Sequence, residues 1–536
     1  MTAEIWDVII VGAGLSGLTA AHLLRKRDAT LRILILEGKD RVGGRTLSME
    51  IPAAAGVDCW DFGGQWVGST QTHIMELIKE LGVETYAQFS RGKKVFHVGG
   101  ATARVRTYTS NIPTLSPLTL FDLTQLLWKI DRLCATVCVQ DPSKTPRAAE
   151  FDSMTLNSYM EQHVWTAEVK EELELSCRSV FGMESSQMSF LFFLVYAAAA
   201  GGLLPLLENN AGSAQEQKIK GGSQQLSQTL AERVGLQSIL LGSAVTNIWQ
   251  DAEWARVTTA AAAAAATFLC RAVIVSCPPH LAAKIHYEPA LPSQREFLTQ
   301  NMPVGHMIKF IITYQTAFWK EKGFSGEIVA GSSTECPFCV TFDATTHSGN
   351  AALVGFIAGQ QASQWTTKQA GERKHAVVCA LVKYLGPEAA SFIHYEDKDW
   401  AEEEFSGGCP TNVMAPGLLT YYQPSLRKPC GRIHWAGTET ATQWCGYMSG
   451  AVQAGQRAAV EVLSELRPAV LTREELHTLR HSQSEETRAQ QTPSSPLKRL
   501  TTAVVVTAAL TVAAALCLTH TERVMLKVTT FFSNAL

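Results

Sequence analysis

The sequence predicts an α/β fold with three parts: a doubly wound, Rossmann-like nucleotide-binding domain that is discontinuous along the chain, an α+β second domain, and a C-terminal transmembrane helix. Three observations lead to this prediction. An apolar strand near residue 8 runs into a glycine-rich turn and a helix, a further strand, loop and long helix occupy 435–463, and twenty uncharged residues occupy 500–519. Strands that alternate with helices in this way are typical of a parallel sheet covered by helices.

The first element is the stretch WDVIIVGAGLSGLTAAHLLRKR, in which the apolar strand 8–11 is followed by Gly12, Gly14 and Gly17 and then by helical periodicity. Glycines at this spacing let the backbone turn sharply and approach a pyrophosphate, whose charge lies at the helix N-terminus. The next strand, LRILILE, ends at Glu37, twenty residues past Gly17 (37 − 17), where a carboxylate can bind ribose hydroxyls. A dinucleotide is therefore expected here.

The run GKDRVGGRT (38–46) directly follows that second strand and indicates which dinucleotide binds. Arg45 supplies fixed positive charge near a diphosphate, for which a nicotinamide-binding fold has no evident need. This run and the stretch WAGTETATQWCGYMSGAVQAGQRAAVEVL (435–463) resemble the flavin amine oxidase superfamily. The resemblance implies FAD, with the loop and helix N-terminus of 435–463 facing the pyrimidine end of the flavin ring.

Composition sets the limits of the remaining interpretation. The chain has 536 residues, 46% of them hydrophobic, which is enough to bury a large core in two or three lobes. Its net charge is 46 − 49 = −3, so no electrostatic footprint for nucleic acid is present. The 13 cysteines show no disulfide-like framework, and the start MTAEIWDVII is unlike a signal peptide, so reduced, cytosol-facing thiols are expected.

Five further motifs narrow the resemblance to the flavin-containing monoamine oxidases, over residues 5–465. They are DFGGQWVGSTQ, KIKGGSQQLS, MPVGHMIK, DWAEEEFSGGC and GTETATQWCGYM, in the order and spacing of that family. The resemblance implies a discontinuous FAD-binding domain and a substrate domain. The expected bounds are 1–90, 220–300 and 400–466 for the FAD-binding domain, 91–219 and 301–399 for the substrate domain, 467–499 for a linker and 500–519 for a membrane anchor.

The resemblance also assigns the cofactor site. The cysteine of SGGC is expected to carry FAD through an 8α-thioether, which makes Cys409 the candidate, held in a Gly-Gly bend that lets the sulfur approach the ring. This hypothesis of a covalent link fails if the denatured protein releases all of its flavin. The expected FAD-binding residues are Gly12, Gly14, Gly17, Glu37, Lys39, Arg45, Gly64, Gln65, Trp66, Val245, Trp400, Cys409, Thr438, Glu439 and Met448.

Lys309 and Tyr447 are the expected catalytic residues. Lys309 lies in the apolar run VGHMIKFIITY, where a lysine is costly unless it is paired or functional, and the family places it beside flavin N5 through a water. Tyr447 matches one of the two facing tyrosines of the family's aromatic slot, but Pro410 replaces the other, so a wider slot is expected. The further expected substrate residues are Gln215, Leu207, Val340 and Phe356, each with ordinary core packing as the alternative interpretation.

The implied reaction is the oxidative deamination of monoamines to an aldehyde, ammonia and hydrogen peroxide, with oxygen as the oxidant. Secondary or tertiary amines are included among the expected substrates, and no metal is required. Three alternatives stay open: a polyamine oxidase, an L-amino-acid oxidase, and a membrane-tethered flavoprotein without turnover.

The C-terminal stretch LTTAVVVTAALTVAAALCLT (500–519) is about the length that crosses a bilayer as a helix. It follows a polar stretch, HTLRHSQSEETRAQQTPSSPLKR (477–499), that is typical of a tether. A buried core helix is the alternative. A tail-anchored protein is expected, with its catalytic body facing the cytosol; basic flanks favour the mitochondrial outer membrane over the endoplasmic reticulum. A homodimer is a further expectation.

Overall fold

The computed structural model describes residues 5–100, 103–109, 113, 115–260, 266–331, 336–477 and 479. One compact unit extends to Leu471, and a second begins at Thr472. The described start of the second unit is capped by Thr472, whose hydroxyl accepts a hydrogen bond from the backbone N–H of Glu475 at 3.2 Å.

An eight-stranded sheet collects strands from three distant parts of the chain, with the order β10-β2-β1-β13-β12-β11-β14 and β20 paired to β13. Its parallel centre is apolar on both faces, as expected for a sheet covered by helices. The strands are β1 (Ile5–Val11), β2 (Ile33–Leu36), β10 (Ile239–Leu240), β11 (Ala244–Gln250), β12 (Ala255–Ala260), β13 (Ala266–Val275), β14 (His286–Glu288) and β20 (Ile433–Trp435). The predicted mixed α/β fold is confirmed.

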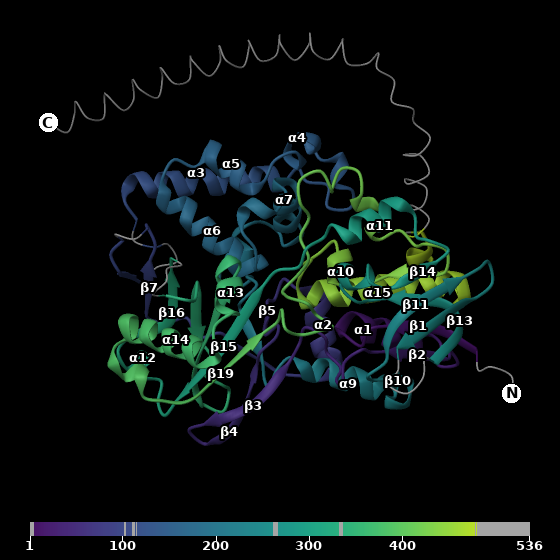
Figure 1. Ribbon diagram of the computed structural model, residues 1–536, viewed down its shortest axis with the longest axis horizontal. Helices are drawn as coiled ribbons and strands as arrows, with labels where there is room; N and C mark the ends of the chain where they lie inside the picture. The colour runs from purple at the N-terminus through teal and green to yellow at the C-terminus, as the bar shows by residue number, and fades with distance from the viewer. Residues whose placement is uncertain are drawn as a thin grey trace, which may run out of the picture. The chain divides into compact units, whose positions relative to one another are not determined.

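Four helices lie together over this sheet, namely α1 (Leu15–Arg27), α2 (Thr72–Leu81), α9 (Gln224–Val234) and α15 (Met448–Leu466), as Figure 1 shows. α1 and α15 pack closely although more than 400 residues separate them. A Cβ added to Gly455 of α15 would lie 2.2 Å from the carbonyl oxygen of Ser16, so only glycine permits this approach.

A second sheet has the strand order β19-β15-β18-β17-β16-β7-β8 and is largely antiparallel. Its strands are β7 (Lys93–His97), β8 (Arg106–Tyr108), β15 (Met307–Tyr314), β16 (Phe324–Ala330), β17 (Val340–Asp343), β18 (Ala351–Ala358) and β19 (Phe392–Asp399). Ile308, Phe310 and Ile312 project from β15 into a core shared with α14 (Ala370–Leu385), near the short helices α12 (Phe318–Glu321) and α13 (Gln360–Trp365).

The hairpin β3 (Ser48–Ala53) and β4 (Gly56–Asp61) packs against the second sheet, with Ile51 and Trp60 in one core with Ile311. Residues 48–61, which the sequence predicted within the FAD-binding domain, thus also contact the neighbouring sheet. A short sheet of β5 (Trp66–Val67), β9 (Gln217–Ile219) and β6 (Thr85–Ala87) adds a further link.

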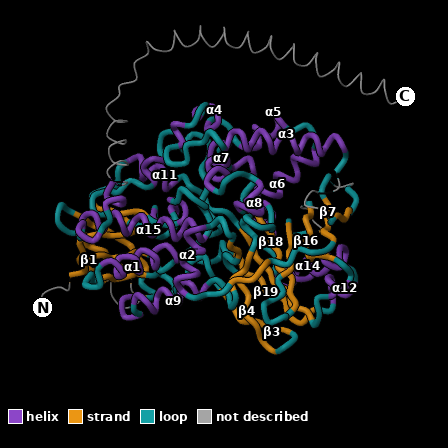
Figure 2. The backbone as a smooth tube through the Cα atoms, turned by 180° about the vertical axis from the view of Figure 1, so that it is seen from behind, coloured by secondary structure: helices purple, strands orange, loops and turns teal. Residues whose placement is uncertain are grey.

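A third region is helical, and Figure 2 shows its helices gathered apart from the strands. Its core is apolar and rich in aromatic side chains, including the stacked rings of Tyr159 and Phe190, whose centres lie 3.8 Å apart. The helices are α3 (Pro117–Cys134), α4 (Ala148–Asp152), α5 (Leu156–His163), α6 (Ala167–Phe181), α7 (Phe190–Ala199) and α8 (Leu204–Leu207), with α10 (Pro279–Ala282) and α11 (Ser293–Gln300) nearer the first sheet.

The C-terminal boundary differs from the expected one. The sequence predicted that the linker starts at residue 467, but the compact unit continues to Leu471, and Arg467 donates to the carboxylate of Asp28, the residue that follows α1, at 2.9 Å. Among the residues that the structure describes, no helix is both long and apolar enough to cross a bilayer. The predicted anchor at 500–519 lies outside the described residues.

Candidate active site

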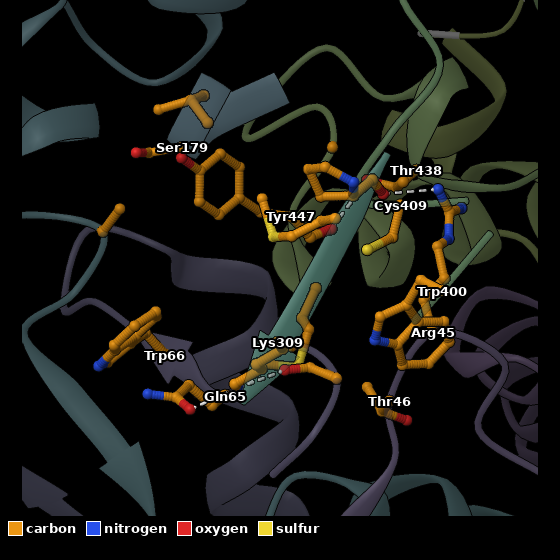
Figure 3. A pocket seen from close by; sticks show the side chains of 18 of the residues that line it. Arg45, Thr46, Gln65, Trp66, Ser179, Lys309, Trp400, Cys409, Thr438 and Tyr447 are labelled. Carbon is orange, nitrogen blue, oxygen red and sulfur yellow. Dashed lines mark hydrogen bonds between the residues drawn. The ribbon is translucent and has the colours of Figure 1, made fainter. Parts of the chain in front are cut away.

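A single elongated cavity of about 650 Å³ extends from the glycine-rich turn after β1 to one face of the second sheet. Residues from both sheets and from the helical region line it, and Figure 3 shows side chains from these elements pointing into it. Most of the predicted cofactor and substrate residues lie around this one space, although they come from distant parts of the chain.

The end of the cavity beside the first sheet is suited to a nucleotide. Gly12 and Gly14 line it, and a Cβ added to Gly14 would meet no atom within 4 Å, so this wall is open to the cavity. α1 begins here without a side-chain cap, which leaves backbone N–H groups for an anion. The Glu37 carboxylate also lines the cavity and accepts the backbone N–H groups of Ala13 at 2.6 Å and Lys39 at 3.0 Å.

Gly17 was predicted to contact the cofactor, but it does not line the cavity. A Cβ at this position would lie 2.2 Å from the carbonyl oxygen of Gly12 and 2.6 Å from Oγ of Ser276. Gly17 therefore allows α1 to pack against the turn and the end of β13, and its effect on the nucleotide site is indirect.

Arg45 lines the cavity, and its charge is paired within the protein. Its guanidinium donates to Glu439 through two hydrogen bonds of 2.6 and 3.2 Å, and to the carbonyl oxygen of Pro410 at 2.8 Å. Although burial opposes ionisation, the charge and hydrogen bonds of Arg45 hold the pKa of Glu439 below its usual value. Glu439 does not line the cavity. Glu439 fixes Arg45 in place, and its contact with the cofactor stays a prediction.

Lys39 also lies outside the cavity lining. Its ammonium group donates to Glu403 at 2.9 Å and to Oγ of Ser406 at 2.8 Å, and it lies 5.6 Å from the centre of the Trp400 ring. Trp400 lines the cavity, and its indole N–H donates to the carbonyl oxygen of Phe62 at 2.9 Å. Lys39 thus supports the aromatic wall from behind.

Lys309 projects from β15 into the part of the cavity that lies against the second sheet (Figure 3). Its ammonium donates to the carbonyl oxygen of Gly63 at 2.9 Å and to Oε1 of Gln65 at 2.5 Å. Burial lowers the pKa of Lys309 from its ordinary 10.5 to about 7, against the attraction of the Asp61 carboxylate. Near neutral pH this amine is therefore poised between its charged and neutral forms. Gln65 Nε2 is buried and lacks a partner among the described residues.

Cys409, Pro410 and Tyr447 line the cavity close to one another along its walls. The backbone N–H of Cys409 donates to the carbonyl oxygen of Gly305 at 2.9 Å, and burial raises the pKa of the thiol to about 12. Tyr447 directly precedes α15, which like α1 begins without a side-chain cap. The hydroxyl of Thr438 donates to the carbonyl oxygen of Tyr447 at 2.8 Å and so fixes this helix start.

The structure supplies an aromatic neighbour for Tyr447 that the sequence did not predict. The ring of Tyr196, on α7, lies 6.0 Å from that of Tyr447, and both line the cavity. Trp444 is nearer, at 5.2 Å in an edge-on arrangement, but it lies outside the cavity lining and its indole N–H donates to Thr70. No sequence signal separates Tyr196 from the other aromatic residues of α7.

The remaining predicted residues all line the cavity. Trp66 lies 5.3 Å from Phe342 and 5.8 Å from Phe356 between ring centres, and forms an aromatic wall near Lys309. Gln215 donates to the carbonyl oxygen of Leu206 at 3.1 Å, and its Oε1 is buried without a partner among the described residues. The full set is Gly64, Trp66, Val245, Met448, Gln215, Leu207, Val340 and Phe356.

Several polar residues of the cavity were missed altogether. Glu172, Ser176 and Ser179 lie on one side of α6 at positions i, i+4 and i+7, while Lys94 and Glu327 come from β7 and β16. The spacing of Glu172, Ser176 and Ser179 could have indicated that they share one face of a helix. Nothing in the sequence indicated that these three elements face the same space.

The arrangement fits an elongated dinucleotide with a ring system at one end. Two uncapped helix N-termini, those of α1 and α15, meet the same cavity and favour negative charge. Glu37 lies where ribose hydroxyls are expected, and buried Gln65 Nε2 offers an unused donor near the ring end. These features of the described residues agree with FAD.

Comparisons with known proteins point the same way. The profile of flavin containing amine oxidoreductases matches residues 15–463. A probable flavin-containing monoamine oxidase A of Dictyostelium discoideum is 38% identical over 467 residues, which are 87% of this chain and 99% of that protein. Amine oxidase [flavin-containing] A of Bos taurus is 38% identical over 465 residues, 86% of each chain.

Solved structures are also similar. The cyclohexylamine oxidase from Brevibacterium oxydans IH-35A has a TM-score of 0.80 and 31% identity, covering 86% of this chain and 99% of that one. A wild-type putrescine oxidase bound to putrescine has a TM-score of 0.80 and 29% identity, covering 86% and 100%.

Proposed function

The chain belongs to the family of flavin containing amine oxidoreductases and is an FAD-dependent amine oxidase of the monoamine oxidase type; from this premise we propose that it deaminates primary monoamines, with secondary and tertiary amines as further substrates. The products are an aldehyde, ammonia (or the corresponding amine) and hydrogen peroxide. One observation carries this proposal: Lys309, Cys409 and Tyr447 share an apolar-walled cavity with the glycine-rich nucleotide turn.

The residues of the chain provide positioning and a suitable environment. When bound, FAD supplies the two-electron oxidation of the amine's α-carbon, and oxygen then restores it. The walls formed by Trp66, Phe356 and Tyr447 exclude water and favour the neutral amine over the ammonium ion. Tyr447 and Tyr196 guide the amine on one side, while the smaller Pro410 leaves the other side wider. Lys309 places a polar group in this apolar space, where it helps to position oxygen or the water that hydrolyses the imine.

For the cofactor, we propose that segments 1–90, 220–300 and 400–466 form the FAD-binding domain, and that 91–219 and 301–399 form the substrate domain. Gly12, Gly14 and Glu37 hold the adenosine and pyrophosphate half. Gln65 and Thr438 lie at the ring end, where Cys409 carries the flavin through an 8α-thioether. Acid precipitation tests the thioether, because a covalent flavin stays with the pellet and a dissociable one appears in the supernatant.

The decisive functional experiment is anaerobic reduction of the purified, flavin-loaded protein. Tyramine, serotonin, phenylethylamine, spermine and an L-amino acid are added separately, and the loss of flavin absorbance is followed. We expect rapid bleaching by the aromatic monoamines. Bleaching by spermine or the amino acid alone would move the substrate class to polyamines or amino acids, and bleaching by none would contradict the proposal.

Lys309→Met separates the two halves of turnover. We expect slower flavin reoxidation by oxygen in this variant, since the polar point beside the ring is removed, while reduction by amine persists. Unchanged reoxidation would exclude the role proposed for Lys309.

For the cellular location, we propose a tail anchor at 500–519 that inserts into the mitochondrial outer membrane, with the catalytic body in the cytosol and a homodimer as the assembly. The support is the uncharged length of this stretch and its basic flanks, Lys498, Arg499, Arg523 and Lys527. Carbonate extraction of cells that express the full chain, or a chain ending at Arg499, tests the anchor. Release of both proteins from the membrane fraction by carbonate would contradict the anchor. Protease protection reports on which side of the membrane the catalytic body lies.

A further inference from the structure

One row of side chains crosses the second sheet from the reacting end of the cavity to its far end. Cross-strand pairing aligns Lys309 with Phe356, Phe356 with Val340, Val340 with Val329, and Val329 with Phe96. All five line the cavity. Three strand intervals separate β15 from β16, and at about 4.8 Å each this amounts to about 14 Å. The cavity wall is thus polar at Lys309 and apolar along its middle.

Polar residues return at the far end of the same sheet face. Lys94, on β7, pairs with Glu327, on β16, at 3.0 Å, and Nδ2 of Asn209 donates to the same Glu327 carboxylate at 3.0 Å. Tyr108, on β8, lies 5.9 Å from the Lys94 ammonium. This pair is satisfied within the protein, so it forms a polar wall without demanding a ligand.

Glu172 faces the same end from α6. The C-terminal end of α6 is adjacent to the reacting end, since a Cβ added to Gly182 would lie 2.9 Å from the carbonyl oxygen of Cys409. Glu172 precedes Phe181, the last residue of α6, by nine residues (181 − 172), which corresponds to about 14 Å of helix. Helix and sheet therefore give the same separation between the reacting end and the far end.

The carboxyl group of Glu172 has an unused acceptor in this space. Its Oε2 is buried and has no hydrogen-bond partner among the described residues, although Glu172 lines the cavity. The neighbouring charges, Arg106 and Glu168, are paired with each other. Burial, together with Glu168 and against Arg106, raises the pKa of the Glu172 carboxyl to about 7. A buried acceptor without a donor is costly, and native proteins rarely leave one without a reason.

We propose that Glu172 and the Lys94–Glu327 pair form a subsite for a second hydrogen-bond donor, a hydroxyl or an ammonium group, at the end of the substrate remote from the reacting amine. This inference rests on the proposed amine oxidation and specifies its substrates: amines with an apolar middle and a polar far end. Phe356, Val340 and Val329 contact the middle, and Glu172 accepts from the far group. A plain alkylamine leaves Glu172 without a donor.

The test compares matched substrates of equal length. Hexylamine, 6-aminohexan-1-ol and 1,6-diaminohexane form one set, with eight- and ten-carbon sets alongside, and phenylethylamine and tyramine form an aromatic pair. The readout is kcat/KM from peroxide production by the flavin-loaded full chain. We expect at least one amino alcohol or diamine to exceed the plain amine of its set by about tenfold or more, because a hydrogen bond to a buried acceptor is gained.

Two variants and one control assign the preference to Glu172. Glu172→Leu should reduce the ratio of polar to plain substrate to about one, whereas Glu172→Gln should keep the hydroxyl preference and lose the ammonium preference. Glu161→Gln, at an exposed position of α5, should leave both ratios unchanged. Because each ratio compares two substrates of one enzyme preparation, partial misfolding cancels.

Plain amines preferred in every set, or a polar preference that survives Glu172→Leu, would overturn the inference while amine oxidation itself stands. Loss of the ammonium preference alone in Glu172→Gln supports the inference, because the amide oxygen still accepts a hydrogen bond from a hydroxyl, and an unchanged ammonium preference would overturn it. A protein that oxidises none of these amines would instead refute the proposed function.

Discussion

Replacing Lys309 with methionine should change how the stability of the protein depends on pH. Methionine is of similar length and carries no charge, so the substitution removes one titrating group from a site that is only 2% exposed. In the native protein, burial lowers the pKa of Lys309 to about 7, whereas an unfolded chain returns it to its ordinary 10.5.

The direction of this pH dependence follows from the number of protons that the folded and unfolded states bind. Between pH 7 and pH 10.5 the unfolded state holds a proton on Lys309 that the folded state has largely lost, so the free energy of unfolding rises with pH. At 1.36 kcal/mol per pKa unit, with the folded group half-titrated at pH 7, the wild-type protein gains about 2 kcal/mol between pH 7 and pH 9. Below pH 7 the full cost of burying the ammonium is present. Lys309→Met lacks this dependence.

Equilibrium denaturation in guanidinium, followed by tryptophan fluorescence at pH 7, 8 and 9, measures the effect. The free energy of unfolding of wild type minus that of Lys309→Met should rise by about 2 kcal/mol across this range. Lys374→Met, which removes an exposed lysine of α14, is the control and should give a flat difference. Equal pH dependence in wild type and Lys309→Met would refute the reasoning, because the buried amine would then titrate as it does in water.

Three other predictions concern the cofactor end. Cys409→Ala should release its flavin into the supernatant after acid precipitation, whereas the precipitate of Cys379→Ala, at an exposed cysteine, should retain its flavin. Equal retention in both variants would exclude Cys409 as the point of attachment. Gly17→Ala should abolish flavin binding, because the new methyl group would lie 2.2 Å from the Gly12 carbonyl oxygen; the ratio of flavin to protein absorbance measures this. Gly371→Ala, where a Cβ would meet no atom within 4 Å, is the matched control, and normal flavin content in Gly17→Ala would contradict the packing argument. Glu439→Gln should cost about 3 kcal/mol in the free energy of unfolding, since it leaves the Arg45 guanidinium without a counter-charge in a largely buried site. Glu253→Gln, at an exposed position, should cost little, and equal stability of the two variants would show that the ion pair is not needed.

The turn and strands at the nucleotide end could be predicted from the sequence because their signals are local. The glycines of the turn, the apolar strands β1 and β2, and Glu37 at the end of β2 lie within about one supersecondary unit, where spacing determines geometry. Gly17 shows the limit of this reasoning. Its position in the motif is correct, yet its function is to let α1 approach β13, which no local spacing reveals.

The contacts of charged residues were harder to predict, because the sign of a charge does not specify which residue or ligand it pairs with. Arg45 and Lys39 are both positive and both follow β2, so both were predicted to contact the cofactor. In the structure Arg45 pairs with Glu439 and Lys39 with Glu403, nearly 400 residues away in each case. The polar far end of the cavity was missed for the same reason, since Glu172 and Glu327 meet only through the tertiary arrangement of α6 and the second sheet.

The pairing of β1 with β13, and of β13 with β20, has a consequence for how the protein is made. A ribosome releases Ile5–Val11 long before Ala266–Val275, and Ile433–Trp435 comes later still, so the nascent chain carries apolar strands whose neighbours do not yet exist. Contacts between residues so far apart in the sequence form slowly, and the folding intermediates expose apolar surface that is prone to aggregation. Because α15 packs on α1 and also borders the cavity, a complete cofactor site requires that synthesis has passed residue 466. Flavin capture is therefore a late event in biogenesis, and chaperone dependence should be greatest just before it.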